Sequence, residues 1–553
     1  MFYALIFCLL VSRISLAHEV LHDSVPASLS TSLPVLTVPT NIPNASSVLL
    51  QCGRVYSGEL NLEGKFQVTV KTEGHCGAAT ITRGVAIAGW RRESVTKPLW
   101  SAAISFQPAQ VEVGGRFMEL AHFSQAPEIW ITAVSPSPNQ LMISLPNKDV
   151  IGASLVWKAH DWLILVNPIV RYASNVISIK KEAQDEFTFP PQTQFYLEGK
   201  CWMLDAPGEW CVEQGRLVVW PHDGNSPEGR TSAAVHGPAI NANNADSILI
   251  DNIKIKIATI GVEANNSHHL QMNNTQFEQI GEEAIIVGGK DIHLERIQIN
   301  QTGLNGLRFT DDARQIIVRD STIQGAGMLG LPKRSKGAIV LEHAEQAQII
   351  GNTIKDSAYI GIRIFRNAVV ENNHIDRACL RLTDCAGIYT FARDGLPLNS
   401  IIINNDISQT QGSFSFGIYL DDQANHVQVI KNKISHNAGG MQLHNAYNNL
   451  IQENVFFKNK NQQILFNETS DYSLMHDNHI ANNNFSTDDN VPVYRLWSSL
   501  GEKSIYNFGL YKANTYSGAQ NKFAECTGSG MIAWKNWKQR MQDTSLFKFS
   551  VNE

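Results

Sequence analysis

The chain has 553 residues, of which 43% are hydrophobic and 17% are charged, so it can bury a large core and has an ordinary globular composition. Its net charge of -6 excludes the basic footprint of a nucleic-acid-binding protein. Beyond the N-terminus no apolar stretch reaches the roughly 18 residues that span a bilayer, so we expect no membrane partner.

An apolar run at the N-terminus predicts a signal peptide. Residues 2–11 have the length of its hydrophobic region, and Ser15 and Ala17 are small residues suited to cleavage. A buried N-terminal strand is the alternative, but nothing nearby in the sequence would pair with it. We therefore expect a signal peptide over residues 1–17 and an exported protein, periplasmic or secreted.

Seven of the eight cysteines remain once Cys8 leaves with the signal peptide, and an oxidising compartment would let them pair. Local pairs 52–76, 201–211 and 379–385 are plausible and leave Cys526 odd. Because no pair has C-x-x-C spacing and no dense acidic cluster suggests a calcium cage, we expect no metal and no cofactor.

Composition divides the rest of the chain into segments. The expected divisions are a lead-in (18–46), first β coils (47–90), an inserted, aromatic-rich β subdomain (91–235), the main run of coils (236–490) and a C-terminal cap containing a short helix (491–553).

The main run repeats an x-Asn-x-apolar unit rich in β-branched residues, with steps of 21 to 32 residues. A period near the low twenties is typical of one turn of a parallel β-helix and too short for helical-pair repeats. Each coil must stack on its neighbours to bury its apolar face. An Asn at one register can bond the neighbouring turn's backbone through its amide. The aligned residues are Asn352, Asn373, Asn405, Asn432, Asn454 and Asn478.

Three further motifs carry a family resemblance. They are Leu-Asp-Ala-Pro-Gly-Glu-Trp at 204–210 with the hairpin that ends at Pro221, Gly-Val-Ala-Ile-Ala-Gly-Trp at 84–90, and Gly-Ile-Tyr-Leu-Asp-Asp at 417–422. Together they resemble exported right-handed parallel β-helix proteins of the pectate-lyase-like superfamily. The resemblance covers roughly residues 47–545 and implies an all-β, right-handed parallel β-helix. The family includes glycoside hydrolases acting on plant polysaccharides, with α-L-fucosidase and xylanase activities among them.

Strand alternation predicts an outer binding face. A Gly opens one strand in each coil, and the residues one and three places after it are mostly apolar and should point inward. Residues two and four places after it should then point outward and stack about 4.8 Å apart. These columns contain Arg363, Tyr389, Phe391, Tyr419, Asp421, Gln442 and His444. Aromatic faces beside an Arg, a carboxylate and a His suit sugar rings, although a solvated strand face and cross-strand aromatic pairs would look similar.

Three acidic residues are candidate catalytic groups. Asp421 and Asp422 end one strand, where a turn-capping role is the alternative, and Asp311-Asp312 forms a near copy. Asp384 lies one coil earlier in a segment that resembles the family's Asp-Gly-Gly-Ala-Ile-Tyr element, with Cys385 and Ala386 in place of the two Gly. Glycoside hydrolysis needs one carboxyl group as acid and another as nucleophile or base. The sequence leaves retention or inversion open.

Two other functions remain open. A polysaccharide lyase or uronate epimerase would need a base and a cation, for which Arg363, Tyr389, His444 and the basic loop of Lys333, Arg334 and Lys336 are candidates. A non-catalytic glycan-binding or adhesive solenoid needs neither. In each case we expect a monomer whose partner is a polysaccharide or oligosaccharide.

Overall fold

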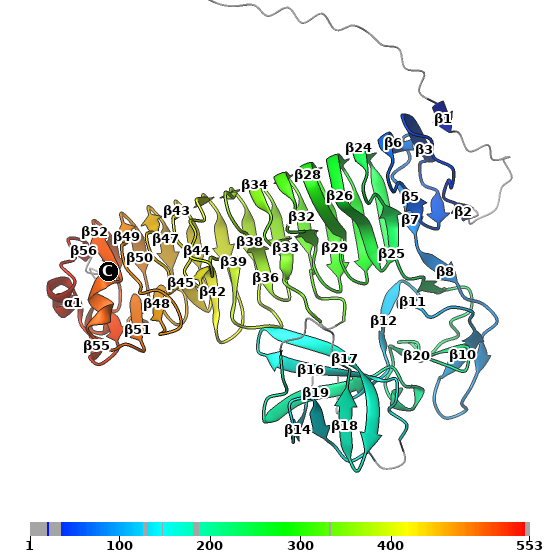
Figure 1. Ribbon diagram of the computed structural model, residues 1–553, viewed down its shortest axis with the longest axis horizontal. Helices are drawn as coiled ribbons and strands as arrows, with labels where there is room; N and C mark the ends of the chain where they lie inside the picture. The colour runs from blue at the N-terminus through cyan, green and yellow to red at the C-terminus, as the bar shows by residue number, and fades with distance from the viewer. Residues whose placement is uncertain are drawn as a thin grey trace, which may run out of the picture.

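The structure is a computed structural model that describes residues 19–21, 35–124, 130–145, 148–180, 187–330 and 333–547. Parallel strands wind into a long stack of coils, and a β insertion projects from one side near the N-terminal end (Figure 1). The predicted parallel β-helix is confirmed. The expected signal peptide, residues 1–17, lies outside the described residues.

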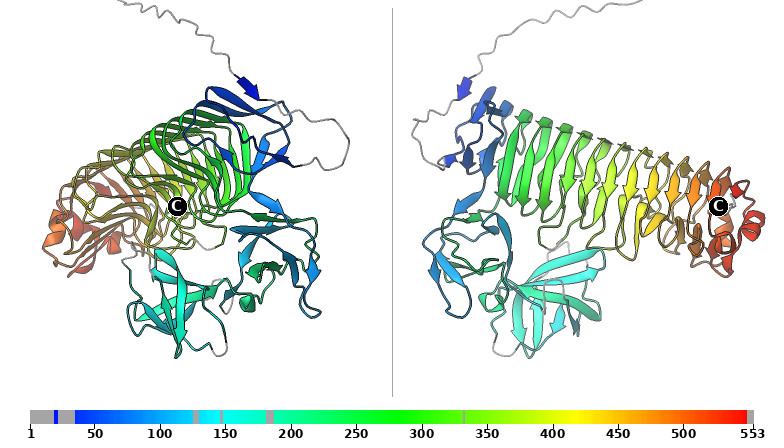
Figure 2. Two further views of the ribbon diagram at one scale, coloured as in Figure 1. Left: turned by 45° about the vertical axis from the view of Figure 1, so that its right-hand side comes forward. Right: turned by 180° about the vertical axis from the view of Figure 1, so that it is seen from behind.

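Within the described residues, the stack contains a sheet of 26 strands, parallel except at β55 (Gly530–Ile532), and a parallel sheet of 15 (Figures 1 and 2). Most coils supply two strands to the larger sheet and one to the smaller. In the coils that matter below, the first strands are β36 (Ile360–Arg363), β39 (Cys385–Phe391), β42 (Ser415–Asp421) and β45 (Gly439–His444). The second are β37 (Val369–Glu371), β40 (Ser400–Ile403), β43 (Val427–Ile430) and β46 (Leu450–Gln452), and the third are β38 (His374–Asp376), β41 (Asp406–Ser408), β44 (Lys433–Ser435) and β47 (Val455–Phe457).

An Asn ladder closes the turn between the second and third strands. The Asn373 side-chain oxygen accepts hydrogen bonds from the backbone N–H and the side-chain amide of Asn352, at 2.9 and 3.0 Å. Its own amide donates to the Ile349 carbonyl at 2.8 Å. The pattern repeats through buried residues. At one end the Ser321 backbone N–H donates to Asn352, and at the other the Ser545 hydroxyl accepts from the Asn514 backbone N–H. The members are Asn352, Asn373, Asn405, Asn432, Asn454, Asn483 and Asn514.

The last predicted member of this ladder was wrong. Asn454 bonds Asn483, whereas Asn478 accepts hydrogen bonds from Asn449 in a second, parallel row of amides. Each coil here has Asn at two corners, five residues apart, so a one-dimensional alignment can slip from one corner to the other.

The stack continues beyond residue 490, where a separate cap was expected to begin. Further coils are formed by β51 (Tyr494–Ser498), β52 (Gly509–Lys512), β53 (Thr515–Ser517), β54 (Ala524–Cys526) and β56 (Leu546–Phe547). The helix α1 (Trp534–Arg540) covers their open end, where Trp537 stacks on Tyr494 with ring centroids 4.8 Å apart. Burying both aromatic rings shields the last coil from water.

The insertion lies between two successive coils. It leaves the stack after β7 (Ala79–Thr82) and returns at β23 (Pro238–Asn241), which pairs with β5 (Leu60–Asn61) as the next coil. Because β8 (Gly84–Ala86) already pairs with β22 (Thr231–Ala234), the insertion starts before the expected residue 91. Within the described residues it contains one sheet of eight strands and one of seven.

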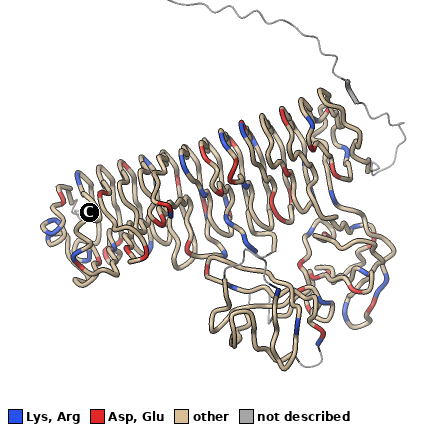
Figure 3. Tube along the Cα trace, viewed as in Figure 1, with Lys and Arg blue, Asp and Glu red and all other residues tan. Residues whose placement is uncertain are grey.

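Three disulfides join the predicted pairs Cys52–Cys76, Cys201–Cys211 and Cys379–Cys385, and Cys526 is free and buried. Disulfides are consistent with an extracellular location. Acidic and basic residues are interspersed along the coils (Figure 3). No helix in the described part of the chain is both long and apolar enough to cross a membrane.

Candidate active site

The carboxylate cluster lies where β42 and β45 end. Register pairs Arg363 with Tyr389, Tyr389 with Tyr419 and Tyr419 with Gln442, as strand alternation predicted. Asp421 pairs with Phe391 of the preceding coil. Neighbouring coils therefore bring side chains from four separate strands to one place on the outer face.

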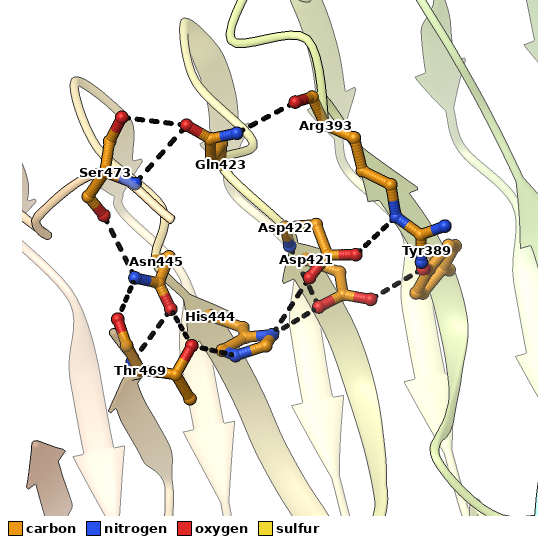
Figure 4. A network of polar contacts seen from close by, with 9 residues as sticks. All are labelled: Tyr389, Arg393, Asp421, Asp422, Gln423, His444, Asn445, Thr469 and Ser473. Atoms are coloured by element: carbon orange, nitrogen blue, oxygen red, sulfur yellow. Dashed lines mark hydrogen bonds and ion pairs between the residues drawn. The ribbon is translucent and has the colours of Figure 1, made fainter. Parts of the chain in front are cut away.

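Asp421 accepts three hydrogen bonds (Figure 4). Its Oδ2 accepts from the Tyr389 hydroxyl at 2.6 Å. Its Oδ1 accepts from His444 Nδ1 at 2.7 Å and from the backbone N–H of Asp422 at 2.9 Å. Both carboxylate oxygens of Asp421 are thus held in place.

Two cations balance the charge of Asp422. Arg393 Nε lies 2.6 Å from its Oδ2, and His444 Nδ1 lies 3.4 Å from its Oδ1. Burial would raise the pKa of Asp422, but these hydrogen bonds lower it. Burial would likewise lower the pKa of His444, but its bonds to Asp421 and Asp422 raise it to about 9, so His444 is a cation at neutral pH. Its other ring nitrogen lies 3.5 Å from the Thr469 hydroxyl.

Asp384 precedes β39 and has a different environment. Burial raises its pKa to about 6, and the negative charge of Asp421 acts in the same direction. Its Oδ1 is buried without a hydrogen-bond partner. The Tyr359 hydroxyl bonds the Asp384 backbone carbonyl at 2.9 Å, and the Cys379–Cys385 disulfide closes the loop that carries it. The Tyr419 hydroxyl interacts with both Asp384 and Asp421, and so links the two carboxyl groups.

Aromatic rings line the N-terminal side of the cluster. Tyr389 and Tyr419 meet edge to face at 5.4 Å, and Phe391 lies 5.9 Å from Phe365 of the preceding coil. The Arg363 guanidinium lies over Phe391, 5.1 Å from its centroid. Phe391 and Tyr419 are 8% and 3% exposed, so the aromatic side chains are mainly a supporting wall.

One sequence-based candidate is misplaced. Gln442 follows Tyr419 in the column, but it is completely buried and presents no surface to a ligand. Phe414 and Phe416 pack with Tyr419 over this part of the strand face. Alternation predicted the register of these side chains correctly, but it carries no information on which of them is buried by its neighbours.

Three residues of the site were not anticipated. Arg393 lies in the turn after β39, Tyr359 precedes β36, and Thr469 follows β48 (Ile464–Glu468). Arg393 keeps the outward alternation of Tyr389 and Phe391, so its position two residues further on was a usable signal. The other two depend on loop conformations.

Asp421, Asp422 and His444 each offer one ligand atom within 4.8 Å of the others, a grouping that could hold a metal ion. His444 Nδ1 already contacts both carboxylates, at 2.7 and 3.4 Å. With Arg393 on Asp422 as well, protein cations already neutralise the acids. The contacts therefore favour an ion-pair network over a metal centre.

The basic loop is engaged elsewhere. Lys333 binds Glu198 of the insertion at 2.6 Å, and Lys336 binds Glu342 at 2.6 Å. Lys333 also lines a cavity of about 450 Å³ between the insertion and the coils, together with Gln110, Trp130, Tyr196 and Glu282. Burial and the neighbouring Glu283 raise the pKa of Glu282 to about 7. The lining of this cavity shares no residue with the carboxylate cluster. We interpret the cavity as part of the contact between the insertion and the coils.

Comparison with known proteins agrees with this architecture. The family model described as the right handed beta helix region matches residues 238–407 and 337–536, together more than half of the chain. A solved glycoside hydrolase is similar at 12% identity, with a TM-score of 0.56 over 73% of this chain and 87% of that one. A complex of XylC with xylose is 12% identical (TM-score 0.37, 93% and 82% covered).

The A-module of a mannuronan C-5 epimerase from Azotobacter vinelandii is 11% identical (TM-score 0.41, 57% and 92% covered). Likeness at such identities shows the fold alone. No curated protein sequence matches significantly.

Proposed function

The chain belongs to the right-handed β-helix family, and we propose that it is a glycoside hydrolase whose catalytic carboxyl groups are Asp384 and Asp421. The supporting observation is the contrast between two neighbouring acids. The pKa of Asp384 is raised to about 6 by burial, whereas Asp421 is bound by three donors. Glycoside hydrolysis requires one carboxyl group that can donate a proton and a second that is held in position beside it.

In this proposal Asp384 donates its proton to the glycosidic oxygen as the bond to the leaving sugar breaks. Asp421 either attacks the anomeric carbon or removes a proton from the water that does so. Tyr389 and His444 orient the Asp421 carboxylate, and Asp422 holds His444 and Arg393 in position. Asp422 thus serves as a positioning residue.

The protonation states favour hydrolysis over β-elimination or epimerisation. Those reactions need an unprotonated base, and Tyr389 and His444 were among the candidates. Burial raises the pKa of Tyr389 well above its ordinary value, and His444 is a cation up to about pH 9, so both are protonated at neutral pH. Lys333 and Lys336 are ion-paired.

The decisive experiment is a screen of the mature protein against plant and microbial polysaccharides. We expect release of reducing ends, a fall in kcat/KM above about pH 6 as Asp384 ionises, and a loss of about 10²–10⁴-fold in Asp384→Asn and Asp421→Asn. Asp311→Asn, at the corresponding turn of an earlier coil and exposed, is the matched control and should retain activity.

Other outcomes would contradict the proposal. An unsaturated product absorbing in the ultraviolet would indicate a lyase. Glycan binding without turnover, unchanged by the Asp384 and Asp421 substitutions, would indicate a non-catalytic binding protein. Circular dichroism of each variant would establish that the fold persists.

A further inference from the structure

Three arginines stand beside the paired phenyl rings of Phe365 and Phe391, and they differ in one respect. Arg366 lies over Phe365 at 4.4 Å and binds Asp394 at 2.6 Å. Arg393 lies over Phe391 at 5.5 Å and binds Asp422 at 2.6 Å. The Arg363 guanidinium lies over Phe391, 5.1 Å from its centroid, and has no carboxylate within ion-pairing distance among the described residues.

The Arg363 side chain is also partly buried. It ends β36 as a partly buried side chain, and its Nε is buried without a hydrogen-bond partner. Its positive charge acts on the hydroxyls of Tyr359 and Tyr389, so it lies among aromatic side chains. Partial burial of a charged group is costly unless an anion compensates it. The protein supplies that anion for Arg366 and Arg393, but the described residues provide none for Arg363.

Arg363 lies on the same outer face of the coils as the carboxylate cluster. Arg363 pairs with Tyr389, whose hydroxyl binds Asp421, and Tyr389 pairs with Tyr419 of the next coil. Arg363 therefore lies two coils from Asp421, about 10 Å along the stack at the usual strand spacing. A sugar chain lying along the coils would reach both groups.

We propose that Arg363 binds an anionic substituent of the glycan, so that the ligand of this face is an acidic sugar chain. This inference rests on the proposed function only in taking the neighbouring Asp384 and Asp421 as the catalytic site. A planar guanidinium with several N–H donors binds carboxylates and sulfates in a bidentate manner. The substituent is the carboxylate of a uronic acid or a sulfate ester, since both present this arrangement of oxygens.

The test measures binding without turnover. Saturation-transfer NMR on the full mature protein would compare D-galacturonate and D-galactose 6-sulfate with neutral D-galactose. We expect the charged sugars to bind more tightly by at least about tenfold, the effect of a hydrogen bond to a charged group. The anion that shows this preference identifies the substituent as carboxylate or sulfate.

Variants assign the preference to one residue. Arg363→Gln should remove it, Arg363→Lys should retain part of it, and Arg366→Gln, the control with its own acid partner, should leave it intact. Equal binding of charged and neutral sugars by the unaltered protein, or a preference that survives Arg363→Gln in a folded protein, would overturn the proposal. Repeating the titration in Asp421→Asn separates the two proposals, because anion preference there does not depend on catalysis.

Discussion

At the scale of single residues, Asp384 connects function with stability. Its pKa is about 6 in the folded protein against an ordinary value of 3.8, because burial disfavours the charged form. The folded state therefore holds this proton more tightly than the unfolded chain. The resulting stability is fully present below about pH 4 and is lost as the pH rises through about 6.

Asp384→Asn should consequently raise the thermal stability at about pH 8, where the wild-type carboxylate is charged and buried. The expected gain is on the order of 2 kcal/mol, reduced for partial solvent access. Near pH 5 the two proteins should unfold at closer temperatures. Calorimetry at both pH values checks this, with Asp311→Asn as the exposed control. A stability difference independent of pH would contradict the assigned protonation.

How much of the site could be predicted varied with the local backbone. Tyr389, Asp421 and His444 came from strand alternation and coil register, which are regular enough to be read from spacing. Asp384 was predicted as a site residue from a motif resemblance alone, because the loop that contains it does not follow the coil repeat. Gln442 was wrong because its side chain is completely buried, which alternation alone cannot reveal. Tyr359 and Thr469 depend on loop geometry.

At the scale of elements, the Asn ladder holds the coils in register. The Asn405 oxygen accepts from the backbone and side chain of Asn373, at 2.9 and 3.0 Å, and its amide donates to Val370 at 2.9 Å. These groups are buried, so removing one member leaves polar partners on both neighbouring coils unsatisfied. A local substitution thus weakens two interfaces between coils at once.

Asn405→Ala should lower the free energy of unfolding by about 3 kcal/mol, because each buried group left unpaired costs about 1–3 kcal/mol. Asn484→Ala, an exposed Asn at the start of β50 (Asn484–Ser486), should cost much less. Urea denaturation followed by circular dichroism compares the two. Similar losses in both variants would mean that the ladder amides contribute little beyond ordinary surface asparagines.

At the scale of the whole molecule, the insertion docks next to the loop of Asp384. The backbone N–H of Thr383 donates to Asp161, in the turn between β16 (Ser154–His160) and β17 (Leu163–Ala173), at 3.2 Å. Lys333 binds Glu198 on the same side of the stack. A segment distant in sequence therefore supports the residue just before Asp384, which no repeat pattern in the coils could reveal.

Lys333→Met should loosen this contact. The substitution leaves Glu198, whose side chain is 8% exposed, without its cation. Because Lys333 is partly exposed, we expect the free energy of unfolding to fall by on the order of 2 kcal/mol. We expect faster hydrogen exchange at the Thr383 amide and a lower melting temperature. The double variant Lys333→Met/Glu198→Gln removes both charges and should recover part of the loss. Unchanged exchange at Thr383 in a destabilised single variant would show that the insertion and the Asp384 loop are held together by other contacts, and that the ion pair stabilises the insertion alone.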